Sequence, residues 1–65
     1  MKTVIVDNRT NKIILAYNSM EPTPTKGQTM SLNIGNNDIT IRVIKIGYSN
    51  HFNNPTANIL AERLV

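Results

Sequence analysis

The sequence predicts a mainly β protein in which five short strands form a small barrel or a curled antiparallel sheet. Two observations support this fold class. Apolar and polar residues alternate in several runs rich in β-branched side chains, and segments rich in Asn, Gly and Pro separate these runs. With 65 residues, the chain forms one domain, residues 1–65, near the lower size limit for independent folding. The longest run, residues 39–48 (ITIRVIKIGY), is expected to be the central strand.

This central run changes phase in its middle. Its apolar residues form two successive sets: Ile39, Ile41 and Val43, then Ile44, Ile46 and Tyr48. A one-residue step in a regular strand turns every later side chain to the opposite face. A β-bulge near Val43 and Ile44 would absorb the extra residue, bend the strand and direct both sets into one core. Arg42 and Lys45 would then share the outer face. The alternative is a flat strand covered on both faces by a partner sheet or subunit.

The first two runs, residues 2–7 and 12–17, are expected to form a hairpin around the polar loop 8–11. Both strands are apolar on two faces. In the first strand, Val4 and Val6 are on one face and Ile5 is on the other. In the second, one face carries Ile13, Leu15 and Tyr17, and the other carries Ile14 and Ala16. A lone domain of this size would expose one of these faces, so the chain is expected to form a homo-oligomer, most simply a two-fold dimer.

The middle of the chain contains a connection and a second hairpin. Pro22, Pro24 and Gly27 exclude a regular helix or central strand from residues 18–27. Residues 28–34 then alternate strictly, which predicts a strand with one buried face. The segment 35–38 (GNND) predicts a tight turn into the central run, because Gly and Asn tolerate positive φ.

The last third of the chain is expected to hold a polar loop at residues 49–55, in which Phe52 is the large apolar residue and folds back onto the domain. Residues 57–65 fit two structures. As a strand they would close the sheet, and as a short helix they would cap the barrel. The strand is favoured because four strands alone leave an edge unpaired.

The residues do not indicate catalysis. His51 is the single histidine, cysteine is absent, and the four carboxylates are far apart in the sequence. The three glycines match no phosphate-binding motif. We therefore expect no enzyme activity, no cofactor and no metal. The apolar run after Met1 is too short for a signal peptide or membrane span, which predicts a soluble, cytoplasmic protein with no membrane partner.

The formal net charge of +3 favours an acidic partner. Arg42 and Lys45 are the candidate residues for an acidic ligand if the bulge forms. The neighbouring pair His51 and Phe52, flanked by asparagines, could stack on and hydrogen-bond to a base or nucleotide. The alternatives are an ordinary solvated strand face for Arg42 and Lys45, and a solvent loop anchored by Phe52.

From Pro24 onward, the sequence resembles the small SH3-like β-barrels common among phage and mobile-element proteins. The residues that carry the resemblance are Pro24, Gly27, Met30, Leu32, Ile39, Ile41, Val43 and Ile46. Gln28 stands where that pattern often has an acidic residue. The resemblance implies a binding role, such as that of a phage accessory or inhibitor protein.

Three functions are compatible with these features. The first is a non-catalytic binding module that acts through protein–protein contacts as a homo-oligomer, using the outer face of the first hairpin or the edge strands. The second is a binder of nucleic acid or a phosphorylated nucleotide through Arg42, Lys45, His51 and Phe52. The third is a structural phage subunit.

Overall fold

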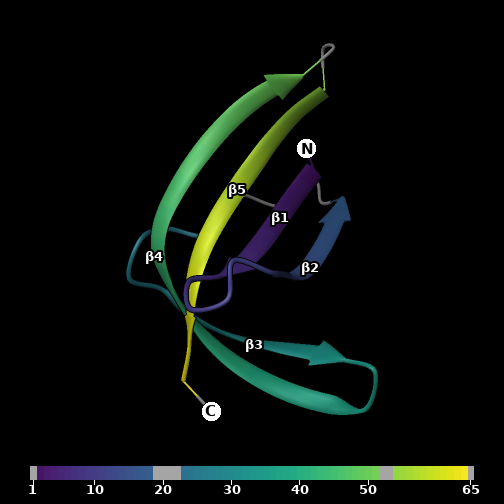
Figure 1. Ribbon diagram of the computed structural model, residues 1–65, viewed down its shortest axis with the longest axis vertical. Helices are drawn as coiled ribbons and strands as arrows, with labels where there is room; N and C mark the ends of the chain where they lie inside the picture. Colours follow the sequence, from purple (N-terminus) through teal and green to yellow (C-terminus); the bar gives the residue numbers. More distant parts are fainter. Residues whose placement is uncertain (1, 19–22, 52–53, 65) are drawn as a thin grey trace.

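The computed structural model describes residues 2–18, 23–51 and 54–64. These residues form five strands of a single curled sheet (Figure 1). The strands are β1 (Lys2–Asp7), β2 (Ile13–Asn18), β3 (Thr29–Ile34), β4 (Asn37–His51) and β5 (Asn54–Arg63). Their order across the sheet is β2-β1-β5-β4-β3. The predicted mainly β, five-stranded fold is confirmed, and the last segment is a strand and not a helix.

The middle of the sheet is β5, which pairs with β1 on one side and β4 on the other. Residues 39–48 belong to the longest strand, the 15-residue β4, but this strand lies second from the edge. The prediction of a central position was therefore wrong. The pairing of β5 with β1 is parallel, so the sheet is mixed, while its other three pairings are antiparallel. The first and last strands of the chain thus lie side by side inside the sheet.

A bulge interrupts β4 where the sequence predicts it. Val43 pairs with Ala61 and Lys45 pairs with Leu60, so Ile44 is the extra residue. Figure 1 shows β4 bending strongly along its length, and the β3–β4 hairpin turns away from the other strands. Beyond the bulge, Ile46 packs against the core as expected. Tyr48 does not: it pairs with buried Ala57 but is itself 66% exposed.

The core lies on one face of the curled sheet, here called the inner face. It consists of Ile5, Leu32, Ile39, Ile41, Val43, Ile59 and Ala61. The opposite face of β1, β5 and β4, which carries Val6, Leu60 and Lys45, is called the outer face. The assignment follows from register, because Val6 pairs with Leu60 and Leu60 pairs with Lys45.

The first hairpin departs from a regular ladder. Its register shifts between Ile5 and Val6, so that Ile5 pairs with Leu15 but Val6 pairs with Ile13. Ile13 therefore leaves the face of Leu15 and Tyr17, with which it was predicted to align, and becomes 63% exposed. Asn11, in the loop before β2, takes a left-handed conformation with a φ of 58°, which asparagine tolerates better than most residues.

The two later turns differ in outcome. The β3–β4 turn is confirmed: Ile34 pairs with Asn37, and Gly35 takes a φ of 64°. The polar loop expected at residues 49–55 is instead largely strand, because β4 continues to His51 and β5 begins at Asn54. The backbone ladder sustains the pairing here without a core, and the Asn58 side-chain amide also donates a hydrogen bond to Ser49 Oγ at 3.1 Å.

Candidate functional site

Arg42 and Lys45 share the outer face of β4. Arg42 pairs with Glu62 and Lys45 pairs with Leu60, two residues earlier on β5. Alternate residues of a strand lie on one face, so Glu62 and Leu60, together with their partners, share the outer face. In a regular strand without the bulge, Arg42 and Lys45 are three residues apart and would lie on opposite faces. The bulge thus brings together two of the four predicted site residues.

The other two predicted site residues are His51 and Phe52, and the structure describes the backbone position of His51. His51 ends β4, six residues beyond Lys45. A strand of that length spans about 20 Å, so the histidine backbone is far from the lysine position. Phe52 lies outside the described residues. The structure therefore does not place the backbone of His51 beside Arg42 and Lys45, and the predicted role of Phe52 stays a prediction.

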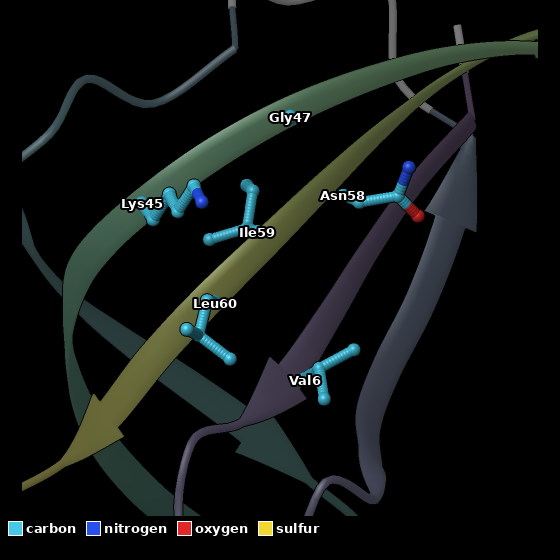
Figure 2. Close-up of a pocket in the computed structure, with 6 residues that line it drawn as sticks. All are labelled: Val6, Lys45, Gly47, Asn58, Ile59 and Leu60. Carbon is cyan, nitrogen blue, oxygen red and sulfur yellow. The ribbon is translucent and has the colours of Figure 1, made fainter.

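A hollow opens on the outer face beside Lys45, with a volume of about 240 Å³. Its lining residues come from three adjacent strands, β1, β5 and β4 (Figure 2). They are Val6, Lys45, Gly47, Asn58, Ile59 and Leu60. We call this feature the Gly47 hollow. Lys45 stands at the β4 side, Asn58 and Leu60 come from β5, and Val6 comes from β1 (Figure 2).

The missing side chain of Gly47 explains the hollow. Gly47 pairs with Asn58 on β5, and a Cβ atom built at this glycine would meet nothing within 4 Å. The backbone conformation is not of the left-handed kind, so turn geometry does not require a glycine here. The glycine therefore leaves open a position that any larger residue would fill with its side chain.

The charges around the hollow are unbalanced. Arg42 Nη1 lies 3.9 Å from Glu62 Oε2, and both side chains are about half exposed, so this ion pair is weak. Lys45 is exposed and has no ion-pair partner within the described chain. Lys2 adds another exposed cation to the same face. Among the described residues where β1, β5 and β4 lie side by side, the outer face carries one carboxylate, Glu62, and three cations, Lys2, Arg42 and Lys45.

The sequence interpretation missed most of the hollow. A glycine inside a strand commonly marks a close approach or a gap, and this signal was available for Gly47. Val6 and Leu60 gave no such signal, because they become neighbours only through the parallel pairing of β1 with β5. Local periodicity cannot reveal a contact between residues at opposite ends of the chain.

No protein-family model, curated protein or solved structure matches this chain. Within residues 2–18, 23–51 and 54–64, no three His, Cys, Asp or Glu side chains gather as metal ligands require. The same residues contain no helix that could cross a membrane. The outer face carries an apolar hollow whose lining includes the Lys45 ammonium group and the Asn58 amide.

Proposed function

We propose that this protein is a non-catalytic binding module of the cytoplasm that acts through protein–protein contacts on its outer face. The observation that carries the proposal is the Gly47 hollow. Its apolar side chains, Val6 and Leu60, lie on a sheet face on which no other strand of residues 2–18, 23–51 and 54–64 packs. Apolar surface left in this way on a small soluble domain commonly marks an interaction site. The hollow has no acid–base pair in its lining, which favours binding over catalysis.

We further propose that the chain self-associates through its edge strand β2. Within the described residues, β2 pairs on one side with β1, and Ile13 on this strand is 63% exposed. Pairing of β2 with the same strand of a second copy would extend the sheet and bury both Ile13 side chains. A role as a phage accessory or inhibitor protein is supported by the pattern that begins at Pro24.

Native mass spectrometry of the protein, purified gently from its host cells, tests the binding function. We expect a second protein of different mass to be retained in stoichiometric amount. Leu60→Lys should release it, because the substitution places a charge in the contact surface. Asn36→Lys, in the exposed β3–β4 turn, is the control with the same charge change away from the outer face.

The outcomes separate the candidate functions. Retention of the partner by the Leu60→Lys variant would contradict the proposed surface. A monomer alone, at all concentrations and without any bound molecule, would contradict both the binding function and the self-association. Ordered assemblies of the pure protein would instead indicate a structural subunit.

Binding of nucleic acid or a phosphorylated nucleotide is the second candidate, favoured by the shared face of Arg42 and Lys45. Phosphate contacts release counterions, so the affinity for an oligonucleotide would fall steeply as salt is raised. Fluorescence anisotropy with a short labelled oligonucleotide measures this slope. Reversing both charges, with Arg42→Glu and Lys45→Glu, should abolish binding. Unchanged affinity in that double variant would exclude this site.

A further inference from the structure

We propose that the Gly47 hollow receives one apolar side chain from an acidic segment of a partner protein, and that a carboxylate of this segment pairs with Lys45. The inference rests on the proposed function and adds the chemistry of the partner. It follows from the size of the hollow, from its lining and from the charge of the face around it.

The size of the hollow fits a single side chain. Pockets for drug-sized ligands and cofactors usually measure about 300–1,000 Å³. The Gly47 hollow, at about 240 Å³, is smaller and is open to solvent. Protein interfaces commonly place one aromatic or aliphatic anchor in such a pocket, where most of the binding energy concentrates. Val6 and Leu60 supply apolar walls for an anchor of this kind.

The charge of the outer face indicates an acidic partner. Where β1, β5 and β4 lie side by side, the described residues of this face include three cations, Lys2, Arg42 and Lys45, and one carboxylate. This carboxylate, Glu62, already lies 3.9 Å from Arg42. Lys45 is the cation at the rim of the hollow. Two copies meeting outer face to outer face would bring these cations together, and like charges across an interface oppose association. The same excess of positive charge attracts an acidic segment.

The lining argues for a peptide over a nucleic acid. Single-stranded nucleic acids bind to small β domains chiefly by stacking bases on aromatic side chains. Among the described residues, no aromatic side chain lines the hollow. Tyr48, the next residue along β4, belongs to the inner-face row, where it pairs with Ala57. An apolar side chain needs only the aliphatic walls that are present.

The test is a titration of the ¹⁵N-labelled full-length protein with capped pentapeptides, followed by amide chemical shifts. The probe is Glu-Asp-Phe-Asp-Glu, acetylated and amidated at its ends. One matched peptide replaces Phe by Ser, and another replaces the four acids by Gln and Asn. We expect the probe to shift the amides of Gly47, Asn58 and Leu60. Both matched peptides should bind more weakly.

Variants locate the site. Gly47→Leu should abolish the shifts, because its side chain occupies the hollow; it should still fold, since its Cβ atom meets open space. Thr29→Leu, which adds the same side chain to β3 away from the hollow, should leave the affinity unchanged. Lys45→Gln should lower the affinity for the acidic probe about two- to fivefold, as expected for an exposed ion pair. It should not change the affinity for the uncharged peptide.

Four results would overturn the inference. The first is that Gly47→Leu binds the probe as tightly as the unmodified protein, and the second is that the probe does not bind at millimolar concentration. The third is that a short oligothymidylate shifts the same amides, and the fourth is that raising the protein concentration alone shifts them. The last two would identify a nucleic acid or a second copy as the occupant. If Leu60→Lys releases a native partner that Gly47→Leu retains, the proposed function stands and this inference fails.

Discussion

Ile59 and Ile13 belong to one sheet but have different surroundings. Ile59, on the strand in the middle of the sheet, is fully buried, with neighbours from β1 and β4. Ile13, on the edge strand, is 63% exposed. A domain of this length is expected to have a free energy of unfolding of about 3–10 kcal/mol. The loss of one buried side chain is therefore a large fraction of the total.

We predict that Ile59→Ala lowers the free energy of unfolding by about 2–5 kcal/mol, because it removes buried methylene groups and leaves a cavity. Ile13→Ala should change the monomer's stability by less than about 0.5 kcal/mol. Urea denaturation at low protein concentration, followed by circular dichroism, measures both values. Similar losses for the two variants would show that Ile13 is also part of a packed core.

Gly35 lies in the β3–β4 turn and Gly47 lies inside strand β4, and the two positions place different demands on the backbone. Gly35 is at the first central position of a two-residue turn and has a φ of 64°, which side chains rarely adopt. Gly47 lies in β4 with ordinary strand geometry and open space around it. The first glycine is required by the backbone, and the second is not.

We predict opposite effects of the same substitution. Gly35→Ala should destabilise the protein by about 1–2 kcal/mol, because a Cβ atom is strained at positive φ. Gly47→Ala should stabilise it by about 0.5–1 kcal/mol, because it removes the entropic cost of a glycine inside a strand. Melting temperatures of the two variants provide the comparison. A loss of stability in Gly47→Ala would mean that the hollow is closed by a neighbour.

Elements governed by local pattern could be predicted from the sequence. The extra apolar residue between Val43 and Lys45 indicated the bulge, and the glycine and asparagines after Ile34 indicated the turn. The register of the first hairpin could not be predicted, because alternation placed Ile13 with Leu15 and the shift at Val6 separates them. The length of β4 was also underestimated, since residues 49–51 pair through backbone hydrogen bonds that leave no hydrophobic pattern.

At the scale of the molecule, the parallel pairing of β1 with β5 determines the architecture. It joins residues 2–7 to residues 56–61 and places the last strand in the middle of the sheet. No local signal predicts such a pairing, and the Gly47 hollow depends on it because Val6 and Leu60 meet there. Arg42 and Lys45 could be predicted as a pair, but the hollow beside them could not.

We predict that hydrogen exchange will be slowest in the middle strand, at residues 57–61, because β5 is paired on both sides. Exchange should be fastest among the strands in β2 and β3, the two edges. Amide exchange followed by NMR at neutral pH measures this order. If β3 exchanged more slowly than β5, the order of the strands would have to be different.

The most direct test of the account is the set of Hα–Hα NOEs between β4 and β5. The bulge places Arg42 and Lys45 on the outer face beside the hollow and keeps Val43 and Ile46 on the inner face. It predicts close Hα–Hα contacts of Val43 with Ala61 and of Ile46 with Ile59. A ladder without a bulge would continue from Val43 and Ala61 to a contact of Lys45 with Ile59. Observation of the Ile46–Ile59 NOE would support the account, and a Lys45–Ile59 NOE in its place would contradict it.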